Sequence, residues 1–201
     1  MGKGFATVEQ EEFRLPSQDD RLFTDEGQPE DIARVFQVNY WVFLLGYKRA
    51  GDILVEGLER GYKSPDLLIF PVLFLYRHYI ELALKHVVYL GDQLKVTTPK
   101  IRKVHDLAAL WRECRKVLEQ IDQGDLSQQF DATETLLVEF TSLDPWSFVT
   151  RYPEQARIFP EGSVPNKVNL KHVSVIVGRI SNLLDGAAQV IEKFLEDSAH
   201  N

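Results

Sequence analysis

The sequence has almost no cysteine and no apolar run of the length that a membrane span needs. Cys114 is the only cysteine in 201 residues, so no disulfide can form within the chain, as is typical of a reducing compartment. The longest apolar segments, YWVFLLGY and DLLIFPVLFLY, fall short of the roughly 20 residues of a transmembrane helix. The opening MGKGFATVEQEEFRLP lacks the apolar core of a signal peptide. We therefore expect a cytoplasmic protein without a membrane partner.

The signatures of several common catalytic classes are also missing. The chain contains no glycine-rich phosphate loop, no Gly-x-Ser-x-Gly elbow and no Cys-x-x-Cys pair. Helical di-iron sites use Glu-x-x-His motifs, and none occurs here. We therefore expect no metal and no cofactor, and interpret the His78-x-x-Glu81 pair as a hydrogen bond rather than as metal ligands. Cys114 has no evident base beside it, so we expect a core residue.

The net charge of −7 argues against a basic coat for nucleic acid, but the charge is unevenly distributed. Residues 85–116 hold eight Lys and Arg against three acidic residues, a local excess of +5. Such a patch on an acidic protein can attract phosphate, and the alternative is a solvated helix face and loop.

What the sequence does have is helical periodicity, and it predicts an all-α bundle of about five helices. We expect an acidic, flexible arm over residues 1–29 and a single helical domain over 30–199. The predicted helices cover about 30–60, 65–90, 105–121, 127–142 and 168–196. Residues 143–167 contain four prolines and predict a long loop before the last helix. We expect Trp41, Phe43 and Trp111 in the core.

The second predicted helix has clear boundary signals. Ser64 suits an N-cap, Pro65 has the backbone angle of a first helical turn, and Asp66 favours the positive end of the helix dipole. Gly91 is expected to end the helix. Pro71 lies beyond the first turn, where it removes a backbone hydrogen bond and predicts a kink.

This same helix carries a polar stripe within an apolar sequence. In LYRHYIELALKH, residues Arg77, His78, Glu81 and Lys85 fall within an arc of about 100° at helical spacing. A solvent-facing ladder of ion pairs is one interpretation. A functional site is the other, because the rest of the helix is too apolar for a surface helix and because His105 follows on the next helix. His86 points to another face and is expected to be structural.

The segments FPVLFLYRHYIELALKHVV, HDLAALW and SFVTRYP, the last ahead of a long final helix, resemble helical bacterial proteins of the HEPN superfamily. The resemblance covers roughly residues 66–195. It implies a helical bundle that forms a homodimer, a role in a toxin–antitoxin or phage-defence system, and a cognate antitoxin-like partner. It also implies RNA or nucleotide as the ligand.

Active HEPN domains are metal-independent ribonucleases with an Arg-x(4–6)-His motif near the start of the last helix. This chain has no such motif and instead has KVNLKH, from Lys167 to His172. Lysine cannot hold a phosphate through two parallel hydrogen bonds as arginine does. Arg151, in the long loop, is the candidate that supplies the guanidinium.

A ribonuclease of this kind needs an acid, a base and cations at the phosphate. The candidate acid and base are histidines, which exchange protons near neutral pH, and Glu81 is expected to orient one of them or to hold Arg77. The candidate catalytic residues are His78, Glu81, His105 and His172. The candidate phosphate- or RNA-binding residues are Arg77, Lys85, Arg151, Tyr152 and Lys167. The alternative function is a non-catalytic binding or dimerisation module in which the polar stripe is structural.

Overall fold

The computed structural model describes residues 15–18, 20–23, 27–33, 39–61, 64–97, 104–122, 126–143, 150–151 and 167–199. The chain divides into two units, Met1–Gln37 and Val38–Asn201. Among its described residues, the first unit contains a single 3₁₀ turn, η1 (Pro29–Asp31). The second unit contains the bundle.

All regular secondary structure in the described part of the second unit is helical, which confirms the predicted all-α fold. Its five helices are α1 (Tyr40–Glu59), α2 (Pro65–Gln93), α3 (Leu107–Ile121), α4 (Ser127–Leu143) and α6 (Leu170–Ala199). The last four predicted helices agree with these bounds to within three residues at each end. No residue of the described stretches is in a strand.

The start of the first helix was predicted about ten residues too early. Ile32 has extended backbone angles, φ −96° and ψ 114°, and therefore ends η1 instead of continuing a helix. The helix begins after Asn39, whose side-chain oxygen accepts a hydrogen bond from the Val42 amide at 2.9 Å. This cap satisfies a backbone donor that the first helical turn leaves unpaired, so the helix begins here although the apolar spacing extends further back.

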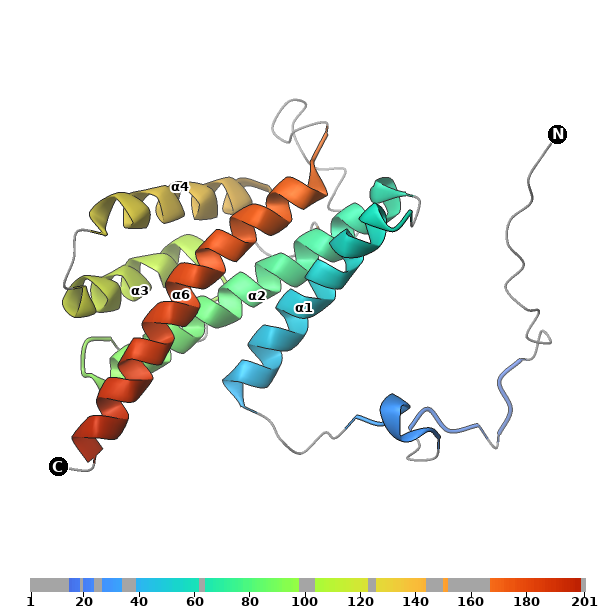
Figure 1. Ribbon diagram of the computed structural model, residues 1–201, viewed down its shortest axis with the longest axis horizontal. Coiled ribbons are helices and arrows are strands. Elements are labelled where there is room, and N and C mark those ends of the chain that lie inside the picture. The colour runs from blue at the N-terminus through green and yellow to red at the C-terminus, as the bar shows by residue number, and fades with distance from the viewer. Residues whose placement is uncertain are drawn as a thin grey trace. The chain divides into compact units, whose positions relative to one another are not determined.

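The beginning of α2 is close to the prediction, with Pro65 at the first helical position. Ser64, however, has a φ of 142° and its side chain makes no capping hydrogen bond. The helix continues through Pro71 as one ribbon in Figure 1.

The predicted end of α2 at Gly91 was wrong, because the helix continues to Gln93. Gly91 is buried where α3 approaches α2, and a Cβ atom at this position would lie 2.3 Å from Cγ2 of Val117. The glycine therefore allows two helices to pack closely and does not terminate one. The left-handed residue that follows the helix is Lys95, with a φ of 61°.

The helix α2 is the centre of the bundle, with α1, α3 and α6 packed around it and α4 packed on α3 (Figure 1). Trp111 and Cys114 are fully buried, and burial raises the pKa of the Cys114 thiol. Trp41 is partly buried against the core, as expected. Phe43 was predicted to be a core residue, but it is exposed at the surface of α1.

By length and composition α2 resembles a transmembrane helix, with a mean hydropathy of 1.6 over its most apolar window. Half of that window is buried inside the bundle, where α2 is the core helix. Its apolar character is therefore compatible with a soluble protein.

Replacement of Gly91 by alanine tests the close contact between α2 and α3. The added methyl group overlaps Val117, so we expect Gly91→Ala to lower the free energy of unfolding by about 1–3 kcal/mol. Gly178→Ala is the matched control, because a Cβ at Gly178 in α6 meets no atom within 4 Å. It should stabilise the protein by up to about 1 kcal/mol. Urea unfolding followed by circular dichroism measures both, and equal effects would contradict the packing role of Gly91.

Candidate functional site

Three of the predicted site residues converge on the carboxylate of Glu81. The Arg77 guanidinium donates to Glu81 Oε2 at 3.1 Å, and the Lys85 ammonium donates to Oε1 at 2.7 Å. His105 contacts the same Oε1 through Nδ1 at 2.8 Å. Arg77 also donates from Nη2 to the backbone oxygen of His105 at 2.9 Å. We call these four residues the Glu81 cluster.

Helix geometry explains how the Glu81 cluster forms. Arg77, Glu81 and Lys85 are four residues apart and so lie above one another on one face of α2. His105 is brought to that face by the start of α3, where Asp106 Oδ1 accepts hydrogen bonds from the amides of Ala108 and Ala109. This N-cap fixes the chain direction one residue after the histidine.

The cluster passes from the interior of the bundle to its surface. The side chains of Arg77 and Glu81 are 0% and 3% exposed, whereas that of His105 is 67% exposed. A buried carboxylate therefore holds one nitrogen of an imidazole whose ring is mostly in solvent. Arg77 is inside the protein, so its guanidinium is placed to orient the cluster rather than to bind a ligand at the surface.

Glu81 is ionised at neutral pH. Burial acts to raise the pKa of its carboxyl group, but the contacts from Lys85 and His105 outweigh burial and the pKa is lowered below its ordinary value. Because one carboxylate lies between the guanidinium and the ammonium, the cluster carries a net positive charge before any protonation of His105. Such a site favours an anionic ligand.

His78 lies on the same helix but belongs to a different group of side chains. Its ring stacks on Phe74 at a centroid distance of 5.8 Å and meets Tyr47 edge-on at 4.3 Å. The Arg151 guanidinium lies 5.8 Å from the centroid of the Phe74 ring. Burial is the main cause that lowers the pKa of His78; Glu81 opposes it, and Lys85, Arg77 and Arg151 add to the lowering. His78 is therefore neutral at pH 7.

The remaining predicted site residues are placed elsewhere. His172 is exposed near the start of α6, where its backbone amide donates to the Asn169 side chain at 3.0 Å. It lines an apolar cavity of about 180 Å³ between α2, α4 and α6, and it makes no hydrogen bond with the Glu81 cluster. Lys167 is exposed just before α6. Tyr152 lies outside the described residues.

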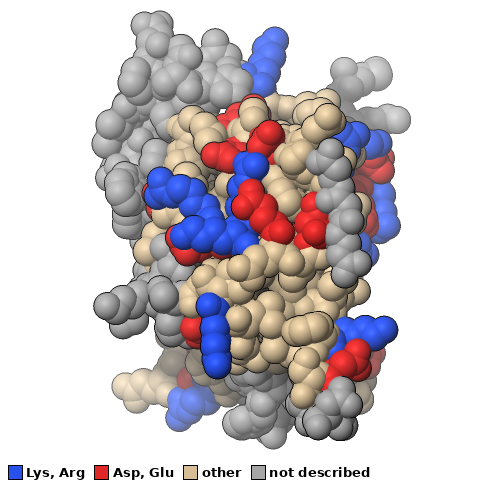
Figure 2. Space-filling model, turned by 90° about the vertical axis from the view of Figure 1, so that its left-hand side faces the viewer, with Lys and Arg blue, Asp and Glu red and all other residues tan. Residues whose placement is uncertain are grey.

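The predicted basic patch is partly neutralised where it is described: Lys85, Arg115 and Lys116 are in ion pairs, while Lys95 and Arg112 are exposed. Arg115 contacts three carboxylates, those of Glu119, Asp131 and Glu134, and these contacts raise its pKa. Lys116 pairs with Glu113, and Lys85 pairs with Glu81. Figure 2 shows Lys and Arg interleaved with Asp and Glu on the side of the molecule where α3 and α4 lie. Lys100, Arg102 and Lys103 lie outside the described residues.

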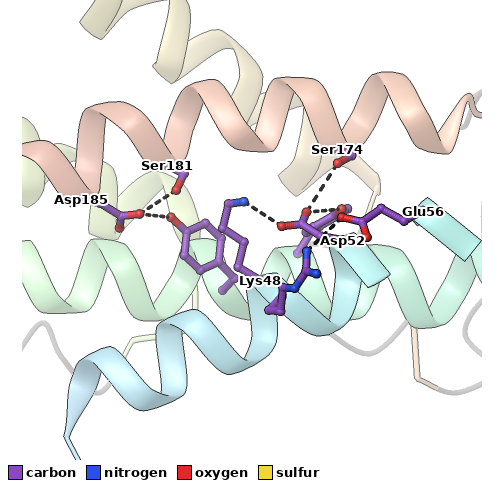
Figure 3. Close-up of polar contacts among 9 residues, drawn as sticks. Lys48, Asp52, Glu56, Ser174, Ser181 and Asp185 are labelled. Carbon is purple, nitrogen blue, oxygen red and sulfur yellow. Dashed lines mark hydrogen bonds and ion pairs between the residues drawn. The ribbon is translucent and has the colours of Figure 1, made fainter. Parts of the chain in front are cut away.

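A second polar network, not predicted from the sequence, joins α1, α2 and α6 (Figure 3). Asp52 of α1 accepts from the Tyr76 hydroxyl at 2.8 Å and the Lys48 ammonium at 2.9 Å. Ser174 of α6 donates to the same carboxylate at 3.5 Å. Burial is the main cause that raises the pKa of Tyr76, so its hydroxyl stays protonated and donates.

The other half of this network is centred on Asp185 of α6. Its Oδ2 accepts from the Tyr79 hydroxyl at 3.0 Å and from the Ser181 hydroxyl at 2.6 Å (Figure 3). The sequence feature that could have predicted this network is the pair Tyr76 and Tyr79 on the apolar side of α2, because a buried tyrosine hydroxyl needs a hydrogen-bond partner. The identity of that partner depends on which helices lie beside α2.

His86 is structural, as its position on the helix predicted. It is buried, stacked on Tyr40 at a centroid distance of 4.8 Å and packed edge-on against Trp41. Its Nε2 lies 3.3 Å from a carboxylate oxygen of Glu192, which also accepts from the Trp41 indole. Burial lowers the pKa of His86, and Glu192 and Asp185 oppose this effect.

The described part of the chain holds no group of three or more His, Cys, Asp or Glu side chains that could bind a metal ion. No protein-family model matches the chain, no curated protein matches its sequence, and no solved structure matches its fold.

Removal of the Glu81 charge tests the energetic role of the cluster. Glu81→Gln leaves Arg77 and Lys85 without their buried counter-charge, so we expect a loss of about 3–5 kcal/mol of unfolding free energy. Glu113→Gln is the control, since it breaks a more exposed pair with Lys116 and should cost less than about 1 kcal/mol. Urea midpoints measured at constant m-value compare the two variants. If Glu81→Gln lowered the unfolding free energy no more than Glu113→Gln, Glu81 would not be the buried counter-charge of Arg77 and Lys85.

Comparison of the wild type with Glu81→Gln also predicts how stability depends on pH. Because the pKa of Glu81 is lowered on folding, its ionised form contributes stability that is present above its ordinary value of 4.5 and lost as pH falls through the lowered value. The stability difference between the wild type and Glu81→Gln should therefore be largest at pH 7 and shrink below pH ~4.5. Urea midpoints across this range provide the measurement, and a difference that stays constant would be inconsistent with an ionised Glu81.

Proposed function

We propose that this protein is a HEPN-like RNA- or nucleotide-handling protein of the cytoplasm that works without a metal, with the Glu81 cluster as its site. The observation that carries the proposal is an exposed imidazole held at Nδ1 by a buried, ionised carboxylate. A carboxylate accepts hydrogen bonds and donates none, so Nδ1 carries the proton. In neutral His105, Nε2 then presents its lone pair outward, as a general base requires.

The chemistry that this arrangement supports is transfer of the RNA 2′-hydroxyl proton. The base removes the proton, the 2′-oxygen attacks the adjacent phosphorus, and the 5′-oxygen leaves with a proton from an acid. In the proposal His105 is the base, and Lys85 and Arg77 supply positive charge for the phosphate, Arg77 from within the protein. Glu81 is the positioning residue.

The other predicted residues have narrower roles in this proposal. His78 is neutral at pH 7 and therefore suits a base or a stacking surface better than an acid. Arg151 supplies a second cation close to His78. His172 and Lys167, near the start of α6, remain candidates for the acid and for contact with the RNA backbone.

The alternative function is a non-catalytic binding module, and one observation favours it. Arg77 has no exposed surface, and its guanidinium bridges the Glu81 side chain and the backbone of His105. A network of this kind fixes the register of α2 against α3 whether or not a ligand binds. The setting in a toxin–antitoxin or phage-defence system, with an antitoxin-like partner, rests on the sequence resemblance alone.

Cleavage of labelled RNA in EDTA tests the proposal. We expect the wild type to cleave and His105→Ala to lose roughly 10²- to 10⁴-fold in rate, the usual contribution of a general base. Glu113→Gln is the control, because Glu113 forms a surface ion pair with Lys116 outside the Glu81 cluster, and it should keep the wild-type rate. His172→Ala tests the candidate acid separately: loss of the alkaline limb of the pH–rate profile would assign that role to His172.

Thermal unfolding of each variant verifies that the fold is intact. An inactive wild type, or cleavage that is equal in the wild type and His105→Ala, would rule out the catalytic proposal. RNA binding measured by fluorescence anisotropy on the same proteins would then decide the alternative, because binding without cleavage supports the non-catalytic module.

A further inference from the structure

An apolar cavity lies between α4 and the first half of α6, with α2 beneath it. It has a volume of about 180 Å³, and nine of its eleven lining residues are apolar, among them Leu73 of α2, Phe140 of α4 and Ile176 of α6. None of the lining residues belongs to the Glu81 cluster. The cavity reaches the surface, because its other two lining residues, Glu139 and His172, are exposed. We call this space the α4–α6 cavity.

The packing of α4 explains why the cavity is open. Among the described residues, α4 packs on α3 rather than on α6, so the apolar side chains of α4 and α6 leave a space that neither helix fills. Ordered water is a poor occupant of such a space, since a bound water needs roughly two to four polar partners. A cavity of about 150 Å³ with apolar walls is large enough to bind a benzene-sized molecule. The α4–α6 cavity therefore has room for one ring.

The mouth of the cavity offers hydrogen-bond acceptors that no other described side chain uses. Glu139 of α4 makes no hydrogen bond or ion pair in the described part of the chain, and the same is true of the His172 ring. No Lys or Arg stands three or four residues before or after Glu139, so α4 itself supplies no counter-charge. A carboxylate accepts hydrogen bonds and donates none, so Glu139 suits a ligand whose polar end is a donor.

The charges around the mouth indicate which kind of donor fits. Three cations lie next to lining residues in the sequence without lining the cavity themselves: Lys167, Lys171 and Arg179. Lys171 pairs with Glu59 of α1, whereas Lys167 and Arg179 are exposed. An ammonium group at the mouth would be repelled by these cations, and a carboxylate would be repelled by Glu139.

An uncharged donor avoids both repulsions. A hydroxyl group donates to an ionised carboxylate through a short, charge-assisted hydrogen bond, which is stronger than a bond between two neutral groups. Apolar walls with one or two polar groups that fix the orientation are also the usual construction of a small-molecule site. The shape of the cavity and the chemistry of its mouth therefore agree on the same class of ligand.

We propose that the α4–α6 cavity binds an uncharged, ring-sized apolar molecule that carries a hydroxyl group, of which phenol is the simplest example. The ring lies between the apolar side chains of α2, α4 and α6, and the hydroxyl donates to Glu139. The inference does not rest on the proposed RNA chemistry, because neither Glu139 nor the apolar lining takes part in it.

NMR titration of the full chain with four probes that share one ring tests the proposal. The probes are phenol, toluene, benzylamine and benzoate, which differ in the group attached to the ring. Phenol should bind with a dissociation constant on the order of 1 mM or tighter. Its affinity should exceed that of toluene roughly two- to tenfold, as expected for one net hydrogen bond. Benzylamine and benzoate should both bind more weakly than phenol.

Replacement of Glu139 tests the acceptor at the mouth. Glu139→Ala should abolish the advantage of phenol over toluene and leave the affinity for toluene unchanged. Glu134→Ala is the matched control, because Glu134 is an exposed carboxylate of the same helix that pairs with Arg115 and does not line the cavity. This variant should keep the advantage of phenol.

A larger side chain in the cavity tests the location of the ring. Val173 lines the cavity, so Val173→Phe should weaken the binding of phenol and toluene roughly tenfold or more, because the added ring occupies the space. Val175→Phe is the control, since Val175 is 47% exposed and does not line the cavity. Circular dichroism verifies that the variants fold, and the Glu139→Ala comparison remains decisive if Val173→Phe does not.

Three results would each overturn the proposal. The first is a wild type that shows no saturable binding of phenol up to roughly 20 mM. The second is equal affinity for phenol and toluene, or tighter binding of either charged probe, which would refute the uncharged hydroxyl as the recognised group. The third is phenol binding that persists unchanged in a folded Val173→Phe variant, since the ligand would then occupy another site.

Discussion

The ionised carboxylate of Glu81, inside the bundle, is the interaction on which the rest of the structure depends. Burying a charge is costly unless the charge is paired and hydrogen-bonded, and Glu81 is satisfied by a guanidinium, an ammonium and an imidazole. Two of these donors come from α2 and the third from the residue before the α3 cap. The contacts of His105 with Glu81 and of Arg77 with the His105 backbone therefore tie the start of α3 to this charge on α2.

A second set of polar contacts fixes the other neighbours of α2. Its Tyr76 and Tyr79 hydroxyls donate to Asp52 of α1 and Asp185 of α6. The most apolar helix of the protein thus carries directional contacts to all three helices packed on it, and each contact specifies a register that apolar packing alone leaves loose. This explains why a helix with the hydropathy of a membrane span holds so many ionisable groups.

The members of the Glu81 cluster differ in role because they are buried to different extents. Arg77 and Glu81 are buried and act on the orientation of their neighbours, while His105 reaches the solvent and is the member that a ligand can touch. The same principle separates His86, enclosed by aromatic rings and Glu192, from His105, although both contact a glutamate. Contact with a carboxylate is therefore shared by a histidine enclosed in the core and by one at the surface, and it is exposure that separates the two.

Local patterns in the sequence were enough to predict the five helices, apart from the start of α1, and the members of the Glu81 cluster that lie on α2. Apolar periodicity and capping residues are local properties, and the spacing of Arg77, Glu81 and Lys85 places them on one face of any helix. The cap at Asn39, and with it the true start of α1, competed with an apolar pattern that continued upstream, so it was missed. Three features followed from the packing of the helices: the burial of Arg77 and Glu81 beside α3, the contact of His105 but not His172 with Glu81, and the role of Gly91 in the close approach of α2 and α3. These features depend on which helices pack against each other. Helix neighbours are chosen by the burial of apolar faces from segments far apart in the chain, and no local sequence pattern specifies them.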